Sequence, residues 1–198
     1  MMISLSRWIA FLVSLAFFLI YFKGGMSIMK DVNRSLNTAA GRSYRVAASF
    51  MGLAALTILP TQFLICLGIV EVSSWAEYGP MVILGTLLAI TGISAAFWIR
   101  HRYLGRFWSG TVEIQAGHEV MEHGPYRAVR HPIYAVSLVI YLGIALAFAV
   151  WWNWMACSLM IAGYIWLSNH EDRFLAANLP GYREYQQRTR YRVMPGIW

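Results

Sequence analysis

The chain has 198 residues, 59% of them hydrophobic and only 13% charged, and its formal net charge is +7. Soluble domains are normally about one quarter charged, so this composition excludes a surface that water covers everywhere, and lipid must cover much of it. The two cysteines, Cys66 and Cys157, lie inside apolar runs, which argues against a disulfide framework and against a zinc site.

The apolar runs predict five membrane-spanning helices, because a helix needs about 20 apolar residues to cross a hydrocarbon core of about 30 Å. The first three are expected at residues 8–22, 46–70 and 81–99. The apolar stretch 133–167 would be about 52 Å long as one straight helix, so it must fold back. We expect its turn at residues 151–154, since Trp favours the membrane interface and Asn favours turns, which makes spans four and five a helical hairpin.

The basic residues predict the sidedness of these spans. The loop at residues 71–80 contains Glu71 and Glu77 and no Lys or Arg, whereas the alternate segments hold all but one of the 16 basic residues. By the positive-inside rule, the N-terminus is therefore outside and the C-terminus is in the cytoplasm. The cytoplasmic basic residues are Lys23, Lys30, Arg34, Arg42 and Arg45 after span one, Arg100, Arg102, Arg106, Arg127 and Arg130 after span three, and Arg173, Arg183, Arg188, Arg190 and Arg192 after span five.

The polar segments divide the chain into two parts. Residues 1–100 hold spans one to three and little else. Residues 101–198 are expected to hold a cofactor-binding loop, the helical hairpin of spans four and five, and a C-terminal cytosolic helix.

The segment at residues 100–130 is too long for a plain connection, and such loops are usually functional. It ends on Arg130 and His131, directly before Pro132, a residue that suits the first position of a helix. The amides and the positive dipole end of that helix can receive an anionic group. The simpler alternative is an interfacial anchor with a helix cap.

A second polar segment begins where span five ends, with His170, Glu171 and Asp172. Inside-positive topology does not explain an acidic pair there, and such groups usually face a polar cavity or pair with a cation. The simpler alternative is a surface pair with Arg173.

Several familiar sites are absent from the sequence. Neither glycine-rich nucleotide loop occurs, no G-x-S-x-G motif occurs, and no two of the five histidines have the i, i+4 spacing of a helical metal site. We therefore expect no metal. The basic charge follows the membrane topology, so we expect no nucleic-acid partner.

The ordered set of residues 117–121, 124–126, 130–134 and 171–172, followed by Tyr182 and Tyr185, resembles the isoprenylcysteine carboxyl methyltransferase family and the related phospholipid methyltransferases. The resemblance covers roughly residues 108–195. It implies a membrane methyltransferase that binds S-adenosylmethionine on the cytoplasmic side without a Rossmann fold. With the predicted spans, we expect an all-helical, multi-pass enzyme of a bacterial inner membrane. The implied cofactor contacts are His118, Glu119, Val120, Met121, Tyr126, His131, Pro132, Ile133, Tyr134 and Glu171, and the implied catalytic candidates are His170, Glu171 and Arg130.

One departure concerns the methyl acceptor, which we expect to be lipophilic or amphiphilic. The prenylcysteine enzymes carry an arginine for the substrate carboxylate one helical turn before the first acidic residue, and here that position is Leu167. An amine-methylating phospholipid enzyme is therefore an alternative. A reductase that holds a nicotinamide phosphate with Arg127 and Arg130 is a second alternative, and a non-catalytic membrane subunit is a third.

Overall fold

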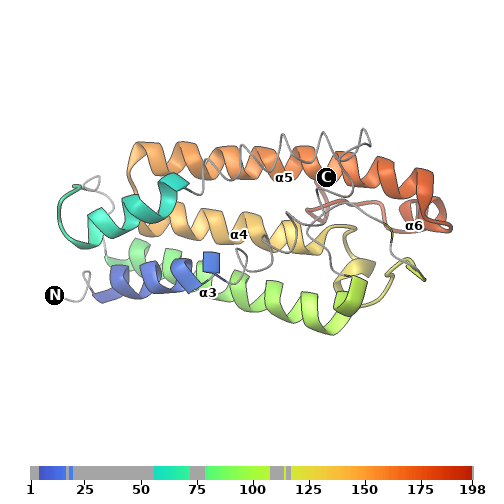
Figure 1. The fold of residues 1–198 in the computed structure, drawn as a ribbon, viewed down its shortest axis with the longest axis horizontal. Coiled ribbons are helices and arrows are strands. Elements are labelled where there is room, and N and C mark those ends of the chain that lie inside the picture. The colour runs from blue at the N-terminus through green and yellow to red at the C-terminus, as the bar shows by residue number, and fades with distance from the viewer. Residues whose placement is uncertain are drawn as a thin grey trace.

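A computed structural model describes residues 5–16, 18–19, 56–71, 79–107, 114 and 117–197. Throughout these ranges every regular element is a helix and none is a strand, which confirms the all-helical class (Figure 1). Two N-terminal helices, Leu5–Ala16 and Leu56–Cys66, precede the labelled elements. These elements are α3 (Gly79–Ile99), a π-helical turn (Arg100–Leu104), two 3-10 turns (Gly105–Phe107 and Gly124–Arg127), α4 (Pro132–Ala147), α5 (Trp151–Asn178) and α6 (Tyr182–Arg188).

One helix of the described part is both long enough and apolar enough to cross a membrane. It is α3 with its π-helical turn, Gly79–Leu104, and it agrees with the third predicted span. The helices Leu5–Ala16, Leu56–Cys66 and Pro132–Ala147 are apolar but shorter. The remainders of the first and second predicted spans lie outside the described residues.

Helices α3 and α4 pack closely because glycines face each other where they cross. A Cβ atom added to Gly85 would lie 2.6 Å from the backbone oxygen of Gly143 and 2.6 Å from the backbone nitrogen of Ala147. A Cβ atom on Gly143 would in turn lie 2.6 Å from the backbone oxygen of Gly85. Small residues of this kind let two helix backbones approach, which is how helices commonly pack in membranes.

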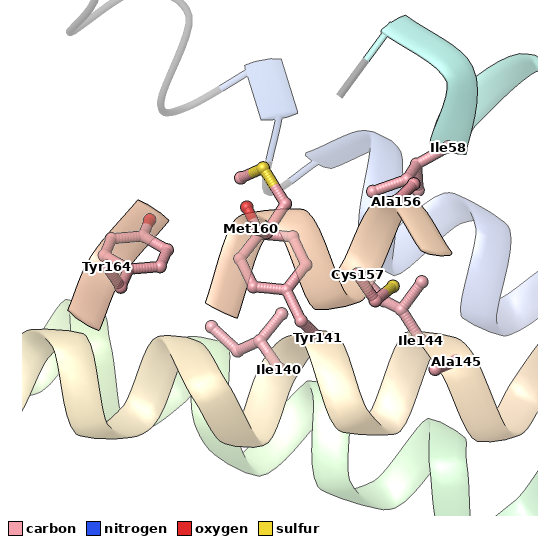
Figure 2. Close-up of a cluster of buried hydrophobic side chains, with 9 residues drawn as sticks. All are labelled: Ile58, Ile140, Tyr141, Ile144, Ala145, Ala156, Cys157, Met160 and Tyr164. Carbon is pink, nitrogen blue, oxygen red and sulfur yellow. The ribbon is translucent and has the colours of Figure 1, made fainter. Parts of the chain in front are cut away.

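The core lies between α4, α5 and the helix Leu56–Cys66. Figure 2 shows Ile140 and Ile144 of α4 beside Cys157 and Met160 of α5, with Ile58 at one end. All of these side chains are buried. Helices α4 and α5 run antiparallel along the long axis of the molecule (Figure 1).

The predicted position of the hairpin turn is wrong by a few residues. Helix α4 ends at Ala147 and α5 begins at Trp151, so the turn occupies residues 148–150. Phe148 and Val150 are buried against the N-terminal helices, which fixes the turn earlier than the tryptophans. Asn153 still serves the turn from inside α5, because its Nδ2 donates to the backbone oxygen of Phe148 at 2.8 Å.

The opposite end of the molecule gathers the polar segments. Helix α6 lies there, at the end of the bundle away from the N-terminal helices (Figure 1). Leu179, Tyr182 and Tyr185 form a small buried cluster against Val120 and Leu175. The chain after α6 then returns to the start of α4, where the backbone nitrogens of Arg130 and His131 donate to the backbone oxygens of Tyr191 and Arg192, at 3.0 and 2.7 Å.

Candidate active site

One cavity brings the predicted cofactor residues together at this end. Every residue of the predicted set lines it except Pro132, which begins α4. The lining comes from the loop before α4, from the first turn of α4 and from α5 and α6. The complete lining is Leu104, Phe107, His118, Glu119, Val120, Met121, Tyr126, Arg130, His131, Ile133, Tyr134, Glu171, Leu175, Leu179, Tyr182 and Tyr185.

Glu171 of α5 provides a partly buried carboxylate on the cavity wall. The hydroxyl of Tyr134 donates to its Oε2 at 2.6 Å, and Nδ1 of His131 lies 3.5 Å from the same oxygen. Burial raises the pKa of Glu171, but hydrogen bonds with His131 and Tyr134 outweigh it, so the pKa lies below its ordinary value. Glu171 is therefore ionised at neutral pH.

His131 lies between two carboxylates. Its Nε2 is 2.9 Å from Oδ1 of Asp172, its Nδ1 faces Glu171, and its ring stacks on Tyr134 with the planes 5° apart. Burial alone would lower the pKa of His131. The hydrogen bonds to Asp172 and Glu171 raise it by more than burial lowers it, so the pKa is about 9, above the ordinary value of 6.5. The imidazole is therefore charged at neutral pH and donates from both nitrogens.

Asp172 is the centre of a buried network that joins four parts of the chain. It accepts hydrogen bonds from Arg130 and His131 at the start of α4, from Tyr182 of α6 at 2.7 Å and from Arg192 of the C-terminal segment at 2.8 Å. Burial raises the pKa of Asp172, but the hydrogen bonds from His131, Arg130 and Tyr182 hold it well below its usual range. The alternative pairing with Arg173 is wrong, because Arg173 is exposed and is not among the partners of Asp172.

The other two predicted catalytic residues, Arg130 and His170, lie in different surroundings. Arg130 lines the cavity, but its guanidinium donates to Asp172 and to the backbone oxygens of Thr189 and Arg190, at 2.6 and 2.9 Å. His170 lies outside the cavity lining and stacks on Trp166, with ring centroids 5.5 Å apart. A helix turns about 100° per residue, so His170 and Glu171 point in different directions.

The loop before α4 is held against the cavity by several contacts. The ring of His118 stacks on Phe107 with centroids 4.8 Å apart, and Glu122 pairs with Arg188 of α6. The hydroxyl of Tyr185 donates to the backbone oxygen of Tyr126 at 2.7 Å. Residues 118–121 thereby line the same cavity as the first turn of α4.

Some lining residues escaped the sequence reasoning. Tyr182 and Tyr185 belong to the recognised motif and could have been included, and Leu175 follows Glu171 by one helical turn on the same face. No signal in the sequence pointed to Leu104 or Phe107. Leu167, which replaces the arginine of the prenylcysteine enzymes, is only 5% exposed and does not line the cavity.

The family model for phospholipid methyltransferases matches residues 80–180, about half of the chain. The chain belongs to the phospholipid methyltransferase family. This family includes the isoprenylcysteine carboxyl methyltransferases, so the resemblance noted in the sequence is confirmed. A search of the curated proteins finds no match.

The family match covers most of the cavity. It includes α3 from its second residue on, the loop before α4, and both Arg130 and Asp172. It ends before Tyr182 and Arg192. Membership in this family supports a methyltransferase, and the family is membrane-associated, in keeping with the apolar helix α3.

Proposed function

We propose that this chain is an S-adenosylmethionine-dependent methyltransferase that modifies a lipophilic acceptor at the cytoplasmic face of a membrane. The observation that carries the proposal is the ionised carboxylate of Glu171, held by Tyr134 and His131 on the wall of a cavity that family motif residues line.

The lining has the chemistry that this cofactor requires. Glu171 can accept hydrogen bonds from an ammonium group or from ribose hydroxyls. The faces of Tyr126 and Tyr134 can stabilise a positive charge through cation–π contacts. Val120 and Leu179 offer apolar surface to a flat base. When bound, S-adenosylmethionine supplies a methyl group that its sulfonium already activates, so the protein mainly has to position the acceptor and exclude water.

The membrane arrangement in this proposal has five spans, with the N-terminus outside and the cavity on the cytoplasmic side. The distribution of basic residues supports that orientation. The separation between the apolar length of α4 and α5 and the polar cluster that carries Glu171 and α6 supports a position of this cluster at a membrane surface. In a bacterium this would be the inner membrane.

The charges around the cavity favour an amine acceptor, such as an ethanolamine phospholipid, over a prenylcysteine carboxylate. Among the described residues that line it, Arg130 is the only Lys or Arg, and its guanidinium already serves Asp172 and two backbone oxygens. The other cation of the lining, the His131 imidazolium, already donates to Asp172 and faces Glu171, so an anionic acceptor would have no cation of its own, which is costly in a partly buried site. Glu119, by contrast, adds a second carboxylate to the lining.

The same charges weigh against a nicotinamide-dependent reductase. That alternative needs Arg127 and Arg130 together around a phosphate. Arg127 is exposed and outside the lining, and the guanidinium of Arg130 is directed at Asp172.

Calorimetry on the protein in detergent tests the cofactor, with S-adenosylhomocysteine and NADPH as separate ligands. We expect binding of S-adenosylhomocysteine only. Glu171→Gln should weaken it by roughly ten- to a hundred-fold, since a hydrogen bond to a charged group contributes about 1.5–3 kcal/mol. Glu184→Gln, which neutralises an exposed carboxylate of α6 outside the cavity, is the matched control.

Equal affinities of the two variants, with both folded, would contradict the assignment of Glu171. A methyl-transfer assay then tests the acceptor, with phosphatidylethanolamine and a prenylcysteine analogue as competing substrates. We expect methylation of the amine. Preferential turnover of the prenylcysteine would overturn the amine assignment.

A further inference from the structure

A second pocket lies beside the first and shares only Arg130 with it. It is lined by Arg130, Arg190, Tyr191, Arg192, Gly196 and Ile197, and we call it the tail pocket. All of its residues except Arg130 come from the segment after α6, which lies beyond the range that the family match covers.

The walls of the tail pocket are held in place by the backbone. Hydrogen bonds from Arg130 and His131 fix residues 191 and 192 beside the start of α4. The chain then reverses in a turn at residues 194–197, where the nitrogen of Ile197 donates to the oxygen of Met194 at 3.2 Å. Pro195 and Gly196 occupy the centre of this turn, and the φ of 81° at Gly196 matches a type II turn.

The tail pocket carries an excess of positive charge. Three arginines line it and no acidic residue does. Asp172, which contacts two of these arginines, already accepts from Arg130, Arg192, His131 and Tyr182. The guanidinium of Arg190 is exposed and has no ion pair with any described residue. Guanidinium groups in a fork arrangement match the oxygens of phosphate better than any other side chain does.

Two apolar side chains beside these arginines point to a lipid rather than to a free anion. Ile197 is 76% exposed and Met194 is 44% exposed, at the turn that closes the pocket. The segment lies at the start of α4, where the apolar length of that helix begins. Clustered arginines next to exposed apolar residues, at the end of an apolar helix, are an arrangement that binds anionic lipid headgroups.

We propose that the tail pocket binds the phosphate of an anionic phospholipid, with Arg190 as the phosphate ligand, Arg192 adding positive charge beside it, and Met194 and Ile197 against the chains. This site is separate from the proposed cofactor cavity and rests on the proposed function only for its place at the membrane. A lipid here would steady the segment that holds Asp172 through Arg192, and through it the position of His131.

The test is lipid binding to the purified full chain in a neutral detergent. The probes are dihexanoyl phosphatidylglycerol, dihexanoyl phosphatidylcholine and inorganic phosphate. We expect phosphatidylglycerol to bind most tightly, because it combines a net negative charge with apolar chains. Arg190→Gln should weaken its binding about tenfold or more, as expected for the loss of one charge-assisted hydrogen bond. Arg173→Gln removes one exposed charge of α5 outside the pocket and should leave binding unchanged.

Three outcomes would overturn the proposal. Equal weakening by Arg173→Gln and Arg190→Gln would show general charge attraction without a site. Inorganic phosphate binding as tightly as phosphatidylglycerol would show an anion site without lipid. Unchanged phosphatidylglycerol binding by the double variant Met194→Ser, Ile197→Ser would show that these two side chains do not make the contacts with the lipid chains that the proposal requires. Binding of S-adenosylhomocysteine to the same samples reports separately on the proposed function.

Discussion

Arg130 donates to both carboxylate oxygens of Asp172, a residue 42 positions further along the chain, with the shortest contact at 2.6 Å. The residue that follows Arg130, His131, contacts both Asp172 and the residue before it, Glu171. Two adjacent residues at the start of α4 thus meet two adjacent residues of α5. This arrangement leaves Glu171 on the cavity wall and turns Asp172 into the buried structure behind it.

Replacing Asp172 should destabilise the protein strongly. Asp172→Asn removes the negative charge that Arg130, Arg192 and His131 share in a buried site, and breaking a buried ion pair on one side costs about 3–5 kcal/mol. Thermal unfolding in detergent should therefore begin at a clearly lower temperature. Glu184→Gln, on the exposed face of α6, should behave like the wild type. A wild-type unfolding curve for Asp172→Asn would mean that the network contributes little.

Stability should fall as the pH rises through the alkaline range, because of His131. Its pKa is about 9 in the folded protein, against an ordinary value of 6.5. A raised pKa means that the stabilisation is fully present below about pH 6.5 and is lost as the pH passes through about 9. The lowered pKa values of Glu171 and Asp172 act only at acid pH, outside this window.

The measurement for His131 is the thermal unfolding midpoint between pH 6.5 and pH 9.5, for the wild type and for His131→Gln. The wild type should lose stability across this interval. The variant should start lower and change much less. Parallel curves for the two proteins would show that another group titrates there.

The crossing of α3 and α4 should tolerate no added methyl group at its closest point. Gly85→Ala and Gly143→Ala each place a Cβ atom 2.6 Å from backbone of the facing helix, which cannot move aside. Overpacking of this kind costs about 1–3 kcal/mol. Gly92→Ala meets mainly the side chain of Ile140, which can rotate, so its effect should be smaller. Thermal unfolding of the three variants should rank them in this order, and equal losses would contradict it.

The orientation of the chain can be tested by cysteine labelling in intact cells. In a variant with Cys66 and Cys157 replaced by Ala, single cysteines are introduced at Glu71, His118 and Glu184. A membrane-impermeant reagent should label the first from outside and reach the other two only after the cells are opened. Labelling at position 118 in intact cells would reverse the orientation and place the cavity outside.

Much of this protein was predictable from local sequence. The apolar runs predicted the start of α3 to within two residues, and they predicted the hairpin of α4 and α5. They could do so because apolar side chains must be buried in protein or lie in lipid, and this requirement acts over one helix length at a time. The family resemblance implied that residues 118–121 and 131–134 contact one cofactor together with Glu171, and all of them except Pro132 line one cavity with it. Pro132 begins α4 as its ring favours.

Only the tertiary structure decided which partners the charged residues take. In the sequence, Asp172 stands next to Arg173, yet helix geometry points that neighbour away, and Asp172 meets Arg130 and Arg192 instead. The same geometry removes His170 from the cavity, although it adjoins Glu171. The pattern along one helix gives the angle between side chains but not the face that packs inward. That face is set by burial against α4, α6 and the returning C-terminal segment, and these contacts join residues far apart in the chain.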